Sequence, residues 1–127
     1  MKVLLDTNAL LWWLVDSPRL DAAARALIAD PAHDILVSVV SLWEIVIKVR
    51  IGKLQIDLGE IEEAIASENF HRLAIAPDHL KALRTLPSHH RDPFDHLLIA
   101  QAISENAIFL TSDRQAQLYP VRVAVAG

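Results

Sequence analysis

Residues 3–15 read VLLDTNALLWWLV, a short apolar run that meets an aspartate and continues into a longer apolar stretch. The run at 3–5 has the length of a buried β-strand, and the stretch from about 8 to 15 is long enough for a helix. Asp6 lies at the junction, where an acidic side chain can cap the start of the helix. The order of strand, acid and helix predicts the beginning of an α/β unit.

The same order recurs along the rest of the chain. Apolar segments at 35–37 and 108–110 predict two more buried strands, 72–75 predicts a third, and 121–125 predicts a final strand or tail. Helices are expected between them, at 22–29, 41–50, 58–67, 78–86, 93–105 and 114–118. Short apolar strands that alternate with helices are typical of a parallel sheet covered on both faces. The sequence therefore predicts an α/β fold with a mostly parallel central sheet.

Length and charge limit the kind of protein this is. A chain of 127 residues with 53% apolar residues is expected to form one globular domain, residues 1–127. Lys and Arg number 12 against 16 Asp and Glu, a net charge of −4. A module that held nucleic acid mainly by neutralising phosphates would be basic, so this balance argues against one. It argues less against a metal enzyme, because bound cations offset acidic side chains.

The absence of cysteine excludes disulfides, thiolate zinc sites and cysteine nucleophiles, and is compatible with the reducing cytoplasm, where we expect the protein to act. We expect no signal peptide, because the first residues run directly into the strand at 3–5. We also expect no membrane span, because Glu44, Lys48 and Arg50 interrupt the most apolar stretch.

Four acidic residues follow predicted strands or open predicted helices. Asp6 and Asp113 come after strands, and Glu44 is expected in the first turn of the helix that follows the strand at 35–37. Asp95 is expected in the first turn of the helix that begins after an Asp-Pro pair. Ligands of parallel α/β sheets bind beyond the carboxyl ends of the strands, and these acids are predicted to gather there.

Each acid taken singly also fits a capping role. Ser41 and Glu44 have the spacing of a capping box, Asp95 suits the helix dipole, and Asp6 and Asp113 are good N-caps. Taken together they would repel one another by about 4 kcal/mol per close pair at an effective dielectric constant of about 20. Such a cluster requires cations, and oxygen ligands favour Mg²⁺ or Mn²⁺ over zinc. A site of this kind is suited to phosphodiester hydrolysis.

Four motifs carry a resemblance to a known family. They are Leu4-Leu5-Asp6-Thr7-Asn8-Ala9-Leu10-Leu11-Trp12, Ser38-x-x-Ser41-Leu42-Trp43-Glu44-Ile45, Arg91-Asp92-Pro93-Phe94-Asp95-His96-Leu97-Leu98-Ile99-Ala100-Gln101-Ala102 and Leu110-Thr111-Ser112-Asp113. In this order they resemble the PIN domain, and more narrowly the VapC-type toxins of bacterial toxin–antitoxin pairs. The resemblance covers essentially the whole chain.

The resemblance implies a three-layer α/β/α sandwich and a Mg²⁺- or Mn²⁺-dependent endoribonuclease. It carries the metal-binding and catalytic roles onto Asp6, Glu44, Asp95 and Asp113. Asp6 is expected to be the central ligand, and Glu44 to bind the metal directly or through water. The resemblance also implies RNA as substrate, inhibition by a VapB-like antitoxin, and a homodimer. A catalytically idle partner-binding domain and a nuclease acting on DNA are the alternatives.

Several neighbours of these acids have predicted roles. Thr111 and Asn8 are expected to hold the carboxylates by hydrogen bonds. Asp92 is either a metal ligand or the N-cap that the following proline suggests.

The histidines at 89, 90 and 96 surround the acids of this motif. We expect loop histidines to be solvated, and to contact RNA phosphate together with Arg91 rather than a metal. Such contacts would strengthen below about pH 6.5, where histidine becomes charged.

Two surface features have open interpretations. The basic residues at 48–53 form either a solvated helix end or a track for phosphates. One of Trp12 and Trp13 is expected in the core. The other, together with Leu42, Ile45, Val46 and Val49, is either buried or lines an apolar surface for an antitoxin helix or a second subunit.

Overall fold

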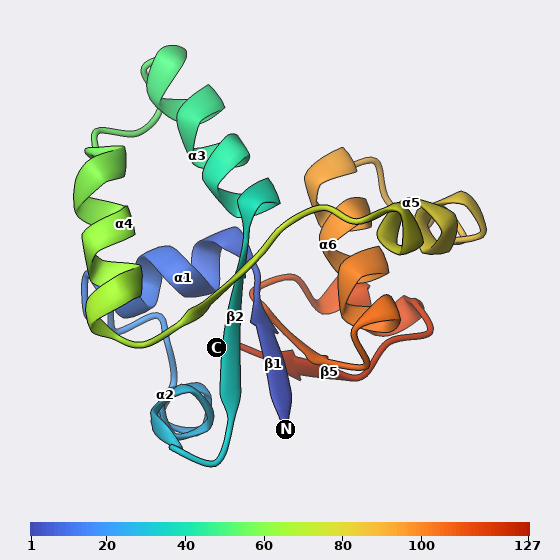
Figure 1. Ribbon diagram of the computed structural model, residues 1–127, viewed down its shortest axis with the longest axis horizontal. Helices are drawn as coiled ribbons and strands as arrows, with labels where there is room; N and C mark the ends of the chain where they lie inside the picture. The colour runs from blue at the N-terminus through green and yellow to red at the C-terminus, as the bar shows by residue number, and fades with distance from the viewer.

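A five-stranded sheet with all strands parallel forms the centre of the molecule (Figure 1). The computed structural model describes residues 1–127. The strands are β1 (Lys2–Leu5), β2 (Asp34–Ser38), β3 (His71–Leu73), β4 (Ile108–Thr111) and β5 (Val123–Val125), and their order in the sheet is β3-β2-β1-β4-β5. The predicted α/β fold is confirmed, and the segment near 121–125 is a strand.

Helices cover both faces of this sheet (Figure 1). They are α1 (Thr7–Leu14), α2 (Ala22–Ala29), α3 (Val39–Arg50), α4 (Leu58–Ser67), α5 (Pro77–Arg84), α6 (Pro93–Ser104) and the 3₁₀ helix η1 (Arg114–Leu118). Helices α1, α2 and α4 lie on one face, α5 and α6 lie on the other, and α3 contributes to both cores. No helix has the length and unbroken apolar character needed to cross a bilayer.

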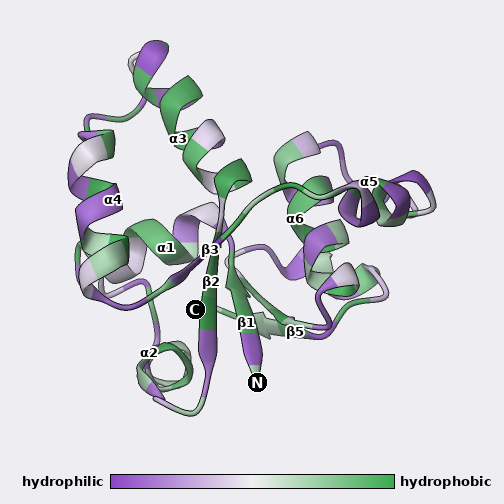
Figure 2. Ribbon diagram, viewed as in Figure 1, coloured by the Kyte–Doolittle hydropathy of each residue, from purple (hydrophilic) through white to green (hydrophobic).

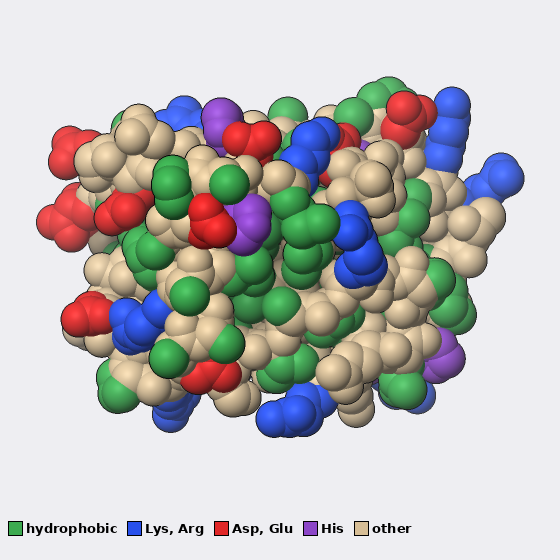
Figure 3. Space-filling model, turned by 90° about the horizontal axis from the view of Figure 1, so that it is seen from below, with side chains coloured by type: hydrophobic (Ala, Val, Ile, Leu, Met, Phe, Trp, Pro, Cys, Tyr) green, Lys and Arg blue, Asp and Glu red, His purple; other side chains and the backbone are tan.

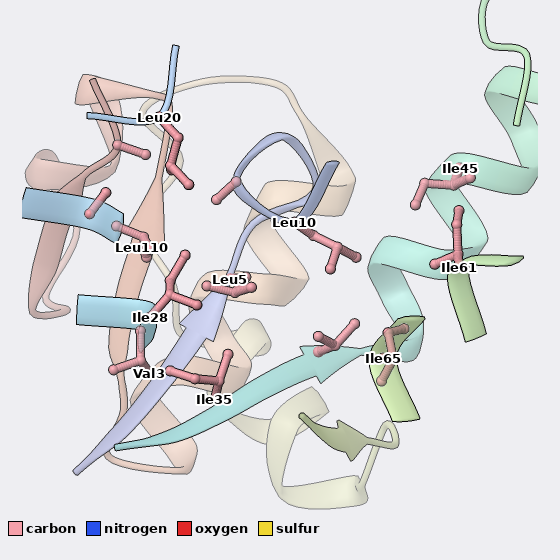
Figure 4. Close-up of a cluster of buried hydrophobic side chains, with 14 residues drawn as sticks. Val3, Leu5, Leu10, Leu20, Ile28, Ile35, Ile45, Ile61, Ile65 and Leu110 are labelled. Carbon is pink, nitrogen blue, oxygen red and sulfur yellow. The ribbon is translucent and has the colours of Figure 1, made fainter. Parts of the chain in front are cut away.

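The two cores follow from the alternation of side chains along each strand. Val3 and Leu5 of β1 point into one core, together with apolar residues of α1, α2 and α4 (Figure 4). Leu4, between them, points into the other core, where it meets Phe109 of β4 and Leu98 of α6. The three central strands β2, β1 and β4 are correspondingly apolar, and polar residues lie at strand ends and on outer helix faces (Figure 2).

The chain changes direction in the sheet between β1 and β4. From β1 it moves outward through β2 to β3, and it then returns across the other face to β4 on the far side of β1. The carboxyl ends of β1 and β4 therefore lie side by side, and the amide of Asp6 donates to the carbonyl of Leu110 at 2.8 Å. This is the switch point where α/β sheets bind their ligands.

The start of α3 differs from the prediction. Ser38, at the end of β2, is the N-cap, and its Oγ accepts from the amide of Val40 at 3.0 Å. Ser41 lies inside the helix and is buried, so the predicted capping box with Glu44 is wrong. Glu44 consequently lies in the second turn of α3 rather than the first, where it projects beside the end of β1.

Candidate metal centre

A polar cavity of about 200 Å³ lies at the carboxyl ends of β1 and β4. It is lined by Asp6, Thr7, Asn8, Glu44, Lys48, Asp92, Asp95, Ser112 and Asp113, and no apolar side chain lines it. All four acids singled out in the sequence are brought together here, and Asp92 joins them. Five carboxylates thus share one small cavity with a single basic side chain, that of Lys48.

Asp6 is the most firmly held of the acids. It is 3% exposed, and its Oδ1 caps α1 by accepting from the amide of Ala9 at 2.7 Å. Its Oδ2 accepts from Thr111 Oγ1 and from the amide of Ser112, each at 2.8 Å. Burial raises the pKa of Asp6, and these hydrogen bonds lower it in part. Asp6 therefore has both roles, because one oxygen caps α1 and the other is held at the end of β4 beside the cavity.

Thr111 links two of the acids, as predicted for the support of the carboxylates. Its hydroxyl donates to Asp6 and accepts from the amide of Asp113 at 3.0 Å. We expect Thr111→Val, which preserves the shape, to lower the free energy of unfolding by about 1–3 kcal/mol, because the buried Asp6 carboxylate loses a donor and the Asp113 amide loses its acceptor. Divalent-metal affinity should fall about 10–100-fold, as for other residues that orient ligands. Urea unfolding and metal titration measure the two effects, and unchanged metal affinity would contradict this role for Thr111.

Glu44 already has a protein partner for each carboxylate oxygen. Its Oε1 accepts from Thr7 Oγ1 at 2.7 Å, and its Oε2 lies 3.0 Å from Nζ of Lys48 one turn along α3. Thr7 also lies 3.1 Å from Ser41 Oγ, which joins the start of α1 to α3. Neither interpretation of the basic residues at 48–53 included this contact, in which Lys48 pairs with Glu44 at the cavity.

Asp92 and Asp95 occupy the first turn of α6. Asp92 is the N-cap predicted from Pro93, and its Oδ1 accepts from the amides of Phe94 and Asp95. The Asp95 carboxylate accepts no hydrogen bond from the protein, although its side chain is only 16% exposed. Burial, and then the nearby charges of Asp92, Asp6, Glu44 and Asp113, raise the pKa of Asp95 to about 8. Asp95 is therefore the acid with the greatest need of a cation.

This raised pKa predicts how pH changes the stability of the metal-free protein. Protonated Asp95 stabilises the fold below its unfolded pKa near 4, and this contribution is lost as the pH rises through about 8. Mn²⁺ or Mg²⁺ should therefore raise the melting temperature, and more at about pH 8 than at about pH 6, because metal and proton compete for the carboxylate. Thermal melts with metal or chelator at both values test this. An equal rise at the two pH values would contradict it.

Asp113, at the end of β4, faces a residue that the sequence did not single out as a ligand. Asp113 caps η1 through Oδ1, and its Oδ2 lies 3.8 Å from Nε2 of His90. The prediction that the loop histidines are solvated is wrong for His90, whose side chain is 9% exposed and stacks on His96 with ring centroids 4.8 Å apart. Tyr119 Oη accepts from the amide of His90 and so holds the loop. His89 is exposed, as expected.

Other supporting residues only partly match the predictions. Asn8 donates to Ser112 Oγ at 3.1 Å rather than to a carboxylate, so its effect on Asp6 passes through Ser112. Thr7 and Ser112 were missed, although each directly adjoins a residue that was chosen. Their position at a strand end was the available signal.

A larger cavity lies at the opposite edge of the sheet. Its volume is about 530 Å³, and it is lined in part by Asp34 and His71 at the starts of β2 and β3. Two of its carboxylates face histidines, Asp34 with His71 at 3.6 Å and Asp30 with His33 at 3.8 Å. On the face seen from below, acidic and basic side chains are interspersed (Figure 3). The smaller cavity, where uncompensated carboxylates converge at the switch point, is the better candidate for chemistry.

The donor set at the switch point fits a divalent cation. Five carboxylates share the cavity with one lysine, and the Asp95 carboxylate accepts no hydrogen bond. The buried Nε2 of His90 also has no hydrogen-bond partner. A cation bound among these groups would supply the positive charge that the protein does not. Oxygen ligands of this kind suit Mg²⁺ and Mn²⁺. These features define a class of protein, a parallel α/β domain with an acidic site at its switch point whose donors suit a divalent cation.

The family follows from comparison with known sequences. The family model for the PIN domain matches residues 3–121, and the chain belongs to this family. PIN domains are usually nucleases. The sequence matches none of the curated proteins with which it was compared.

Solved structures show the same fold. The chain is similar to VapBC2 from Rickettsia felis bound to a DNA fragment from their promoter, with a TM-score of 0.79, 16% identity and full coverage of both chains. It is also similar to DNA-bound VapBC from Salmonella typhimurium, with a TM-score of 0.69, 14% identity, and 100% of this chain and 99% of the other covered. For VapBC-1 from nontypeable Haemophilus influenzae the values are 0.67, 18%, and 98% of each chain.

Proposed function

We propose that this protein is a Mg²⁺- or Mn²⁺-dependent endoribonuclease that acts as the toxin of a toxin–antitoxin pair in the cytoplasm. The observation that carries the proposal is the convergence of five carboxylates on one cavity that a single lysine cannot neutralise. Membership of the PIN family supports nuclease chemistry, and the VapBC complexes among the similar structures support the toxin role.

The residues have distinct parts in the proposed reaction. Asp6, Asp95 and Asp113 would hold divalent metal, with Glu44 binding directly or through water. When bound, the metal supplies a nucleophilic water at neutral pH and stabilises charge on the leaving oxygen. Thr111 and Ser112 keep the Asp6 carboxylate aimed at the cavity.

Lys48 is the one basic group available to a substrate within the cavity. It is 38% exposed and holds Glu44 in place, and it can also offer its ammonium group to a phosphate oxygen.

Cleavage assays with matched substrates test the proposal. Purified protein should cut single-stranded RNA when Mg²⁺ or Mn²⁺ is present, leave DNA of the same sequence intact, and lose activity in chelator. DNA cleavage at an equal rate would support the alternative of a DNA nuclease. Intact RNA with both metals, from protein shown to be folded, would support an idle partner-binding domain.

We further propose a VapB-like antitoxin as partner, bound at an apolar groove between α3 and the start of α4. The groove has a volume of about 120 Å³ and is lined by Ile45, Val46, Val49, Arg50, Ile56 and Leu58. Val49 is exposed there, whereas Ile45 is buried in the core, so only part of the predicted apolar surface is accessible. Trp43, on the same helix, is also exposed. A short amphipathic helix is the partner that such a groove fits.

Val49→Asp tests this partner surface. A carboxylate placed in an apolar interface should weaken co-purification with the co-expressed antitoxin by more than about tenfold, because its burial there is unpaired. RNA cleavage by the isolated variant should be unchanged, since Val49 does not line the acidic cavity. Full retention of antitoxin binding would exclude this groove. Light scattering of the isolated protein tests the expected homodimer.

A further inference from the structure

The buried imidazole of His90 is aimed at two of the carboxylates. Its Nε2 lies 3.9 Å from Asp95 Oδ2 and 3.8 Å from Asp113 Oδ2. It has no hydrogen-bond partner, and it is the only buried side-chain nitrogen or oxygen in the protein without one. A buried polar atom without a partner costs free energy, so its position requires an explanation.

The other ring nitrogen of His90, Nδ1, indicates which tautomer leaves Nε2 without a hydrogen-bond partner. Nδ1 of His90 lies 3.1 Å from Nε2 of His96, and one of the two must donate to the other. A proton on His90 Nε2 would be buried without an acceptor, because both carboxylates lie beyond hydrogen-bond distance. With the proton on Nδ1, donated to His96, no donor is left unpaired and Nε2 presents its lone pair to the acids.

A lone pair that faces two carboxylates is the arrangement of a metal site. One ligand atom each from His90, Asp95 and Asp113 lie within 4.8 Å of one another. Ligands of one Mg²⁺ or Mn²⁺ lie about 3 Å apart when adjacent and about 4.2 Å apart when opposite. The 3.9 Å between His90 Nε2 and Asp95 Oδ2 is close to the spacing of opposite ligands. Asp113 is 36% exposed, so its side chain can turn toward both of them when an ion binds.

We propose that Nε2 of His90 joins the carboxylates of Asp95 and Asp113 as a ligand to the divalent ion, and that this nitrogen makes the centre prefer Mn²⁺ over Mg²⁺. The inference rests on the proposed function in that it assumes a divalent ion in this cavity. Imidazole suits transition metals, whereas Mg²⁺ strongly prefers oxygen, so a nitrogen ligand shifts selectivity toward Mn²⁺. His96, through its hydrogen bond, fixes the tautomer that makes ligation possible.

Pulsed electron paramagnetic resonance of Mn²⁺ bound to the untagged protein tests the ligand directly. We expect spin-echo modulation from a directly bound ¹⁴N in the wild type, and its replacement by a ¹⁵N signal after labelling with ¹⁵N-histidine. His90→Gln should abolish the nitrogen signal and weaken Mn²⁺ binding by about tenfold or more, with less than about a threefold effect on Mg²⁺. The matched control His89→Gln removes an exposed neighbouring imidazole and should keep both the signal and the affinity.

The outcomes separate this inference from the proposed function. Bound Mn²⁺ without nitrogen modulation in the wild type, or modulation that persists in His90→Gln, would overturn the ligand assignment. Metal-dependent RNA cleavage would then still stand. Failure of the folded wild type to bind either ion would overturn both. The labelling result in the wild type decides whether a histidine nitrogen binds the metal. If His90→Gln does not fold, His90→Asn takes its place to decide whether that histidine is His90.

Discussion

Asp6→Asn should abolish metal-dependent cleavage while the protein remains folded. Asparagine caps helices as well as aspartate does, so its side-chain oxygen can keep the hydrogen bond from Ala9 that starts α1. The NH₂ group of the asparagine then replaces Oδ2 and faces the Ser112 amide, which loses its acceptor. The site also loses the carboxylate that is expected to be its central metal ligand. We expect activity to fall by more than about 100-fold, since even residues that only orient ligands contribute about 10–100-fold.

The measurement is the rate of RNA cleavage at saturating Mg²⁺ or Mn²⁺, with circular dichroism as the test of folding. Asn8→Ala is a matched control, because Asn8 lines the same cavity but donates to Ser112 rather than holding the charge. It should lose far less activity than Asp6→Asn. Cleavage by Asp6→Asn at the wild-type rate, after removal of contaminating nucleases, would remove Asp6 from the mechanism.

The sequence predicted the acids of this cavity well where a short rule links a position to a place in the fold. Asp6 follows β1 and Asp113 follows β4, and neighbouring parallel strands end at one edge. Asp95 was placed by Pro93, which fixes the start of α6 and therefore the residue that occupies its first turn. In each case the information lies within a few residues of the chain.

The sequence failed where the deciding contact comes from a distant segment. Ser38 and Ser41 are both plausible caps for α3, and only pairing of β2 with its neighbours selects Ser38. His90 looks like a loop histidine, and its burial depends on Tyr119, which follows almost thirty residues later. The polar residues whose positions depend on distant segments, such as Ser38 and His90, were therefore less predictable than the acids.

Asp95→Asn should also abolish cleavage, but it should make the metal-free protein more stable. The Asp95 carboxylate accepts no hydrogen bond, so replacing it with the asparagine amide breaks none. The substitution also removes a negative charge that burial and four neighbouring acids disfavour. At about pH 8 and above, where the wild-type carboxyl would ionise, the free energy of unfolding should rise by a few kcal/mol, since each pKa unit is worth about 1.4 kcal/mol. Near pH 4 the two proteins should be almost equally stable.

Chemical unfolding in chelator at both pH values measures this difference, and adding Mn²⁺ should reverse it at the higher one. The wild type gains stability from the ion by mass action, whereas Asp95→Asn has lost one of the groups expected to hold it. The opposite signs for activity and stability distinguish a site that crowds acids for a cation from one in which each acid only caps its helix. If Asp95 only complemented the dipole of α6, Asp95→Asn would leave cleavage unchanged and would slightly lower the free energy of unfolding at neutral pH, and that result would refute the metal centre.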